Sequence, residues 1–568
     1  MARKLLVTAF VLVAAIIGWL ASHNRIGAVS FGVVPDIDAP FDGIIKLLEP
    51  DGSTLRLLMV HGIGSHCIGY SHDFISRIAS NLGLKPAHLI NDQITNYSLK
   101  SCIEYKVKRK SIRPIFVQRE ADDQLCKTIF HTQIQSGSEI YQPRENCRAL
   151  RSQLILLGGS KSFSEYGYVR TTDYVRADAP DGGVPLRVYE LTWDATTRWA
   201  KSTYVDYIDN LSSGNRHIVN DNIKKTVIND GFTDAILYIS GYKYHMLHPI
   251  LLALCMIVQD GLALATDEAT EAMGEKHVFF CKPRRIVQAW DDDPPANGRD
   301  KIAVISHSLG TRMFFDAMGS INDPKFDEIL LWFIQPDAED HAMTKKQEEI
   351  MKDKLDAIHR IVNVIDQRLT HIYALANQVP ILEMGEVTSP GHMLGLRARF
   401  SDELPGPAGL GRGFNHFLEK RASAAEESEA DANPIHIMAF SDPNDLLSYD
   451  LKCWYYLSVL RYNTDIIEKI TELKRKEKID KIPLDSKYYF NNCQKYNSEF
   501  WKLVSKKVLI STIDVNLASW NIPFIYADAI GAHTRFFESQ LISGLIACGS
   551  ESLDPWQLRL NYKQPATC

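Results

Sequence analysis

The stretch "KIAVISHSLGTRMFFDAM", residues 301–318, decides how the rest of the chain is interpreted. Its first half is an apolar run that predicts a buried strand, and its second half has the pattern of a helix. Between them lies a turn with Ser308 at its centre. A serine in that place is either a nucleophile on a tight strand-to-helix turn or an ordinary polar residue at the end of a strand.

Small residues flank Ser308 at two positions on each side, with Ser306 before it and Gly310 after it. At a nucleophile elbow the strand and the helix approach each other closely, so bulky side chains at these positions would clash. The pattern therefore fits an elbow. It departs from the usual G-x-S-x-G motif because serine replaces the first glycine.

Strand and helix patterns alternate along most of the chain. Strand-like segments that end in turns occur at residues 55–66, 186–194, 371–385, 435–449 and 508–516. Helical patterns occur between several of them, at residues 71–83, 233–264 and 345–368. This alternation predicts an α/β fold, a mostly parallel sheet with helices on both faces. Ligands of such sheets bind beyond the carboxyl ends of the strands.

Two stretches do not follow this pattern. Residues 84–183 are polar, charged and rich in cysteine, and residues 386–433 are glycine-rich and charged, so we interpret both as insertions. Part of the segment 233–264 is apolar enough to resemble a membrane span. Histidine, proline, glutamine and aspartate residues interrupt it, and we therefore predict a buried helix of the fold there.

Residues 1–24 have the pattern of an export or anchoring segment. Arg3 and Lys4 precede the uncharged, mostly apolar run Leu5–Ala21. A secretory signal peptide should end in a small-x-small cleavage site, and the Trp-Leu-Ala end of this run fits poorly. We favour an uncleaved membrane anchor, which puts the domain 25–568 on the non-cytoplasmic side. Cleavage would instead give a secreted protein.

An exported body would allow its ten cysteines to form disulfides, and we expect these where Cys102, Cys126 and Cys147 cluster. No CxxC pair or zinc-ligand spacing of cysteine and histidine occurs, so we predict no metal. The sequence has no HExxH motif and no GxGxxG motif after a predicted strand, and we expect no cofactor. The net charge of −6 gives no electrostatic reason to bind nucleic acid.

The turn "VHGIG" follows the first predicted strand. Backbone amides at this end of the sheet can face the same reaction centre as Ser308. We expect the amides of Ile63 or Gly62, together with that of Leu309, to form an oxyanion hole. His61 is expected to be a structural residue, hydrogen-bonded beneath the site.

These motifs together resemble the α/β-hydrolase superfamily, specifically its lipase and esterase branch. The resemblance rests on HG after one strand, SxSxG after another, and a later aspartate and histidine. It implies an α/β-hydrolase fold and a Ser-His-Asp triad whose members follow in the order Ser, Asp, His. It covers the strands between Leu55 and Asn516 and the last helix, and not the insertions.

The resemblance places the acid in the turn of residues 435–449, where Asp442 and Asp445 both occur. Leu446 and Leu447 follow Asp445, which is similar to the run after the acid in many lipases. We therefore favour Asp445 as the acid and keep Asp442 as the alternative. The other aspartate is then a turn or helix-capping residue.

The resemblance also requires a histidine late in the chain, and His533 is the only histidine after His436. It lies after the last predicted strand and before a helical segment. We expect His533 to be the general base that takes the proton from Ser308.

The expected function is that of a serine hydrolase acting on an ester, with a lipid or acyl ester as its substrate. An acyltransferase would use the same residues with an alcohol in place of water. The alternative from another class is a catalytically silent protein of the same fold, tethered to a membrane as a binding or scaffold module. Reaction of Ser308 with a fluorophosphonate probe distinguishes an enzyme from a scaffold.

Overall fold

The computed structural model of the chain describes a central sheet, the helices that cover it and the turns at one of its ends. The described residues are 36–37, 40–48, 53–64, 66, 70–87, 116–117, 168–178, 183–201, 205, 224–240, 242–262, 278–279, 286–289, 300–319, 356, 359–379, 382, 414, 417, 435–443, 445–449, 451, 508–515, 517, 520–522, 526–527 and 529–550. The predicted anchor at residues 1–24 and the cysteines Cys102, Cys126 and Cys147 lie outside them.

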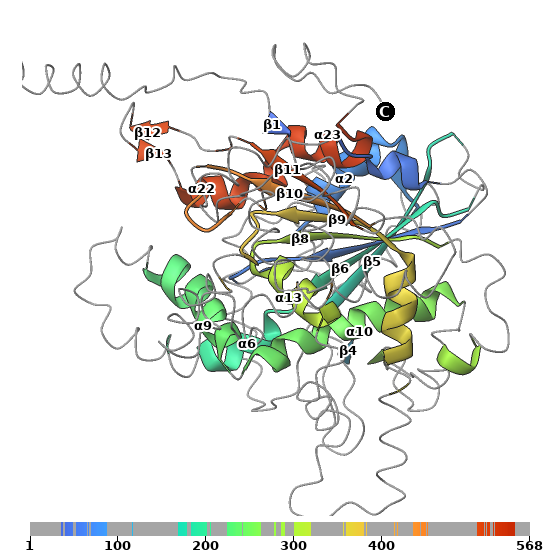
Figure 1. Ribbon diagram of the computed structural model, residues 1–568, viewed down its shortest axis with the longest axis horizontal. Coiled ribbons are helices and arrows are strands. Elements are labelled where there is room, and N and C mark those ends of the chain that lie inside the picture. Colours follow the sequence, from blue (N-terminus) through green and yellow to red (C-terminus); the bar gives the residue numbers. More distant parts are fainter. Residues whose placement is uncertain are drawn as a thin grey trace, which may run out of the picture.

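A nine-stranded sheet runs through the centre of the molecule (Figure 1). Its middle strands pair in parallel, in the spatial order β11 (Val508–Asp514), β10 (Ile435–Ser441), β9 (Leu369–Leu375), β8 (Ile302–His307), β2 (Leu55–Val60) and β6 (Leu186–Thr192). The antiparallel strands β5 (Tyr168–Arg176) and β3 (Leu84–Pro86) extend the sheet beyond β6, and β1 (Asp36–Ile37) pairs with β11 at the other edge.

The parallel strands are apolar because both of their faces are covered. Every residue of β2 and of β8 is buried. Successive side chains of a strand point to opposite faces, so Leu58 and Val60 belong to one hydrophobic cluster and Leu57 and Met59 to the other. The sheet therefore lies between two cores.

Helices cover both faces, which confirms the predicted α/β class. Figure 1 shows α10 (Lys243–Gly261) and α13 (Leu309–Gly319) on one side of the sheet. It shows α2 (His72–Asn81) and α23 (Gln540–Cys548) on the other side. Within the predicted helix of residues 345–368, residues 359–368 are helical and pack with the first group.

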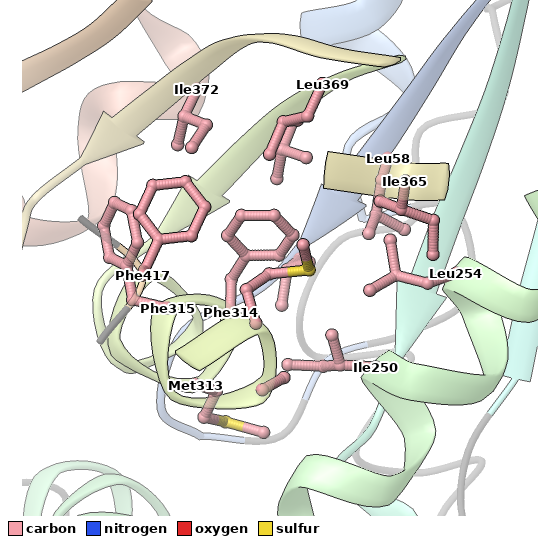
Figure 2. Packing of buried hydrophobic residues seen from close by; sticks show 14 of the residues in the cluster. Leu58, Ile250, Leu254, Met313, Phe314, Phe315, Ile365, Leu369, Ile372 and Phe417 are labelled. Atoms are coloured by element: carbon pink, nitrogen blue, oxygen red, sulfur yellow. The ribbon is translucent and has the colours of Figure 1, made fainter. Parts of the chain in front are cut away.

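The core on the α10 and α13 side is shown in Figure 2. Phe314 and Phe315 of α13 are fully buried beneath the sheet, and Ile250 and Leu254 of α10 pack beside them. Phe315 also meets Phe417 with ring centroids 5.5 Å apart. Phe417 lies inside the predicted insertion 386–433, so part of that stretch belongs to the core.

Helix α10 is the segment whose apolar sequence resembles a membrane span. It carries Pro249 within it, and Leu247, Ile250, Leu254 and Ile257 are buried in the hydrophobic core. In the part of the chain that the structure describes, no helix is both long and apolar enough to cross a membrane. The helix packs against α13 and against β6.

The predicted insertion 84–183 begins and ends within the sheet. Strand β3 lies at its start, and β5 lies near its end and pairs with β6 along Tyr168–Tyr174. In addition, β4 (Phe116–Val117) pairs with β7 (Val278–Phe279) in a separate small ladder. Strands β3 and β5 were not expected from the sequence. Strand β5 is mostly polar, and among its described side chains only Tyr174 and Val175 are buried.

Candidate active site

Ser308 lies at the sharp turn between β8 and α13. Its backbone has φ of 54°, in the left-handed region that non-glycine residues rarely adopt, and its side chain is fully buried. The Ser308 amide donates a hydrogen bond to the Leu375 carbonyl oxygen at 2.8 Å, and the Ser308 carbonyl accepts one from the Thr311 amide. The adjacent strand β9 thus fixes the turn in its strained conformation.

Two glycines allow the chain to pass close to this turn. A Cβ atom on Gly62 would lie 2.5 Å from the Ser308 Cβ and 2.7 Å from the His307 Nδ1. A Cβ atom on Gly310 would lie 2.4 Å from the His61 carbonyl oxygen. Both positions therefore require glycine, and the turn after β2 packs directly on the serine turn.

Ser306 stands where the usual elbow motif has its first glycine. It is fully buried, and its Oγ lies 3.0 Å from the Thr311 Oγ1. The two hydroxyl groups satisfy each other's hydrogen-bonding needs inside the core. The departure from glycine is accommodated because the α13 helix supplies a partner one turn along.

Three side chains form a continuous hydrogen-bonded chain. The Ser308 Oγ lies 2.9 Å from the His533 Nε2, and the His533 Nδ1 lies 2.7 Å from the Asp445 Oδ2. All three residues are buried. They come from the carboxyl ends of β8 and β10 and from α22 (Ala529–Thr534), which follows β11 in the chain. This is the geometry of a serine nucleophile, an imidazole base and an orienting acid.

His307, which precedes the serine, holds the histidine segment in place. Its Nε2 donates to the His533 carbonyl oxygen at 2.9 Å, and its ring packs against Phe537 at a centroid distance of 4.9 Å. The His307 and His533 rings lie 5.1 Å apart. The nucleophile strand and the base segment are therefore linked through a residue adjacent to Ser308.

The two candidate acids have different partners. Asp445 contacts His533, and its Oδ1 also accepts the Leu447 amide at 2.9 Å. Asp442 instead accepts the Leu517 amide and also exchanges long hydrogen bonds with Ser448. The structure thus brings Asp445, and not Asp442, to the imidazole.

Burial opposes the ionisation of Asp445, but contact with His533 outweighs it. The hydrogen bond and the charge of His533, with the Leu447 amide and the Ser448 hydroxyl, hold the pKa of Asp445 below its ordinary value. The carboxylate therefore remains ionised at neutral pH and can stabilise a protonated His533.

The expected oxyanion donors lie where the two turns meet. Leu309 is the first residue of α13, so its amide has no acceptor within the helix. Within the described residues, the amides of Gly62, Ile63 and Leu309 donate to no hydrogen-bond acceptor. They are available for a charge that develops at a carbonyl oxygen bound beside Ser308.

His61 anchors the turn after β2 from below. Its Nε2 accepts the Trp193 amide at 3.0 Å, and its Nδ1 lies 2.8 Å from the Gly62 carbonyl oxygen. The Trp193 indole donates to the His61 carbonyl at 2.9 Å, and the two rings stack. His61 is thus neutral, with its proton on Nδ1, and serves a structural role as expected.

Several residues that support the site were not predicted from the sequence. Trp193, Leu375 and His307 contribute through contacts between strands, and only His307 lies next to a recognised motif. Asn377 and Tyr449 join the turn after β9 to the acid turn: the Tyr449 amide donates to the Asn377 carbonyl at 2.8 Å, and the Asn377 side-chain amide donates to the Tyr449 carbonyl at 3.1 Å. No group of three or more metal-ligating side chains occurs among the described residues.

The chain was also compared with known proteins. Protein-family models, curated proteins and solved structures all give no match to it.

Proposed function

We propose that the chain is a serine hydrolase of the α/β-hydrolase type that cleaves carboxylic esters. The observation that carries the proposal is the chain of hydrogen bonds from Ser308 through His533 to Asp445. A serine hydroxyl is a weak nucleophile unless a positioned base accepts its proton. The strained backbone of Ser308, between a buried strand and a helix, supports the same interpretation.

In the proposed reaction, His533 takes the proton from the Ser308 Oγ as that oxygen attacks the ester carbonyl. The negative charge that develops on the carbonyl oxygen is bound by backbone amides of the turn after β2 and of Leu309. The protonated His533 then gives its proton to the departing alcohol, which leaves an acyl-enzyme. Water, activated by the same histidine, releases the acid and restores Ser308.

A lipid or acyl ester is the expected substrate because of the resemblance to lipases and esterases and the predicted membrane anchor. An acyltransferase would follow the same steps until an alcohol replaced water in the second half.

We also propose that the body of the protein lies on the non-cytoplasmic side of a membrane. Cys255 and Cys548 are both disulfide-bonded, and such bonds persist in oxidising compartments. The apolar run Leu5–Ala21 supplies the predicted anchor. In sealed membrane vesicles whose cytoplasmic face points outward, the body of the chain should resist an added protease until detergent opens the vesicles; degradation of the body in the sealed vesicles would contradict this location.

The test of the proposed activity uses the full chain purified in a mild detergent. Hydrolysis of p-nitrophenyl esters is followed across acyl chain lengths, and Ser308 is probed with a fluorophosphonate. Ser308→Ala and His533→Ala should each abolish turnover. Ser306→Ala is the matched control, since it removes a buried hydroxyl two residues from the nucleophile and should keep turnover.

Two outcomes would redirect the proposal. A folded chain that neither hydrolyses these esters nor takes the label at Ser308 would be a binding or scaffold module. A chain that is labelled and releases p-nitrophenol in a single burst, with turnover only after an alcohol is added, would be an acyltransferase.

A further inference from the structure

Asp234 is a fully buried carboxylate that lies against the turn after β2. It belongs to α9 (Thr233–Ile239), which continues from the π-helix η5 (Lys224–Phe232). Its Oδ2 accepts the Gly64 amide at 2.8 Å and the Lys201 ammonium at 2.7 Å. Lys201 is itself almost completely buried and directly follows the helix α6 (Ala195–Ala200).

A buried ion pair needs an explanation beyond stability, because the cost of desolvating both charges often equals their attraction. Burial raises the pKa of Asp234, and Lys201, Thr197 and the Gly64 amide act in the opposite direction. The pair lies next to the expected oxyanion turn rather than at the far end of the sheet.

The contacts of this turn hold the peptide groups on both sides of Ile63. The Gly62 carbonyl accepts from the His61 Nδ1, and the Ile63 carbonyl accepts from the His66 Nε2 at 3.2 Å. The Gly64 amide is used by Asp234, and Gly64 has φ of 90°, which favours glycine. Both polar atoms of the Ile63–Gly64 peptide are therefore fixed, and the Ile63 amide keeps no partner within the described residues.

We propose that Asp234, with Lys201 as its counterion, is a positioning residue that orients the Ile63 amide as the upstream oxyanion donor. The inference rests on the proposed hydrolase function. A donor contributes most when its direction is set before the charge develops, because no reorganisation is then needed in the reaction. Lys201 cancels the charge of the carboxylate, so Asp234 can hold the turn without repelling the oxyanion.

The test compares two double variants of the full chain that differ only in a hydrogen-bond acceptor. Asp234→Asn with Lys201→Met removes both charges but keeps an oxygen for the Gly64 amide. Asp234→Leu with Lys201→Met removes the charges and that oxygen in a side chain of similar size. Neither variant leaves an unpaired buried charge, which limits the risk of unfolding.

We expect the leucine variant to lose about 10- to 100-fold in kcat, with KM within about twofold of the parent. The asparagine variant should keep kcat within about threefold of the parent. A trifluoromethyl ketone, which forms a reversible tetrahedral adduct with the serine, should bind the leucine variant more weakly by the same factor as the loss of kcat. A purely structural role would lower thermal stability without this match between kcat and inhibitor affinity.

Equal kcat in the two double variants and the parent would overturn the inference while leaving the hydrolase proposal intact. Absence of activity and of labelling in the parent would instead contradict the hydrolase proposal itself. If the leucine variant does not fold, Asp234→Glu decides: it keeps the charge but displaces the carboxylate by one methylene. A folded glutamate variant should lose at least about fivefold in kcat at unchanged KM, and unchanged kcat would reject the role.

A control removes another ion pair, partly buried, at the opposite end of the sheet. Arg56 and Asp300 pair at 2.8 Å near the start of β2 and β8. Arg56→Met with Asp300→Leu should change thermal stability and leave kcat and inhibitor affinity unchanged. A loss of kcat in this control equal to that in the Asp234→Leu double variant would also overturn the inference.

Discussion

At the scale of single residues, the strain at Ser308 is the most informative feature. A non-glycine residue in the left-handed region costs about 1–3 kcal/mol and persists only where its surroundings fix it. Here the Leu375 carbonyl, the Thr311 amide and the close approach of Gly62 provide that fixation. A serine that only ended a strand would have no reason to be held in this way.

The choice between the two aspartates gives the first prediction. Asp445→Asn should lower kcat by about 10⁴-fold, because an amide cannot stabilise the protonated imidazole and favours the wrong tautomer of His533. Asp442→Asn should keep kcat, since its partner is the Leu517 amide and an amide oxygen can still accept that hydrogen bond. Steady-state kinetics on the two variants decides between them, and a larger loss in the Asp442 variant would reverse the assignment.

Gly62 gives a second prediction at this scale. In Gly62→Ala the added Cβ would meet the Ser308 Cβ at 2.5 Å, so one of the two turns must move. We expect a loss of stability of about 1–3 kcal/mol and a slower reaction of Ser308 with a fluorophosphonate. Labelling rates and thermal unfolding measure both effects.

Gly261→Ala serves as the control for this prediction. An added Cβ at Gly261 comes only to 3.3 Å from the Arg56 Nε, at the end of a long side chain. Its labelling rate should equal that of the parent. Equal labelling rates in Gly62→Ala and the parent would show that the close approach has no bearing on the nucleophile.

At the scale of elements, the sequence predicts those strands that are buried on both faces. Strands β2, β8, β9, β10 and β11 are mostly apolar because helices cover both faces of the sheet. Strands β5 and β3, which extend the sheet beyond β6, lack this signal because β5 is mostly polar and β3 has only three residues. A strand at the edge of a sheet is specified by its neighbour more than by its own composition.

The residues of the candidate site could likewise be predicted only in part from the sequence. The serine turn and the histidine could be located in the sequence because each follows a recognisable strand. For the acid, the sequence favours Asp445 only through the resemblance and leaves Asp442 as the alternative, since both share one turn and only the folded backbone decides which side chain reaches His533. Asp234 and Lys201 gave no signal, because charged residues in a helical pattern are usually exposed.

The helix that follows Ser308, α13, contains a buried carboxylate that makes the stability of the fold depend on pH. Asp316 of α13 is fully buried and contacts the Tyr238 hydroxyl, the Lys243 ammonium at 2.7 Å and the Arg312 guanidinium at 2.9 Å. Burial acts to raise the pKa of Asp316, but Arg312 and Lys243 outweigh it and lower the pKa to about 2. The carboxylate therefore binds protons less readily in the folded chain than in the unfolded one.

A group with a lowered pKa stabilises the fold above its unfolded pKa, and this contribution is lost as the pH falls through the folded value. For Asp316 the contribution is about 2 kcal/mol at neutral pH, and it should disappear between about pH 4 and pH 2. Asp316→Asn should destabilise the protein by about 3–5 kcal/mol at pH 7, and the difference from the parent should narrow over the same range. Urea unfolding as a function of pH tests this, and a constant difference would contradict it.

At the scale of the whole molecule, each of the two layers of helices contains a disulfide-bonded cysteine. Cys255 lies in α10 on one face of the sheet, Cys548 lies at the end of α23 on the other, and both are disulfide-bonded. Neither cysteine belongs to the triad or to the turns that form it. The bonds should therefore stabilise the fold without taking part in the proposed reaction.

Reduction under native conditions should lower the thermal stability of the chain, because each native disulfide contributes about 2–5 kcal/mol. Activity per folded molecule should stay the same at temperatures below unfolding, since the hydrogen bonds among Ser308, His533 and Asp445 do not depend on these cysteines. A Cys255→Ala, Cys548→Ala double variant should already have the lower stability and should respond less to the reductant. Alkylation followed by mass spectrometry provides the direct check: labelling of Cys255 and Cys548 in the denatured but unreduced protein would show free thiols, and would remove the support that these bonds give to an oxidising compartment.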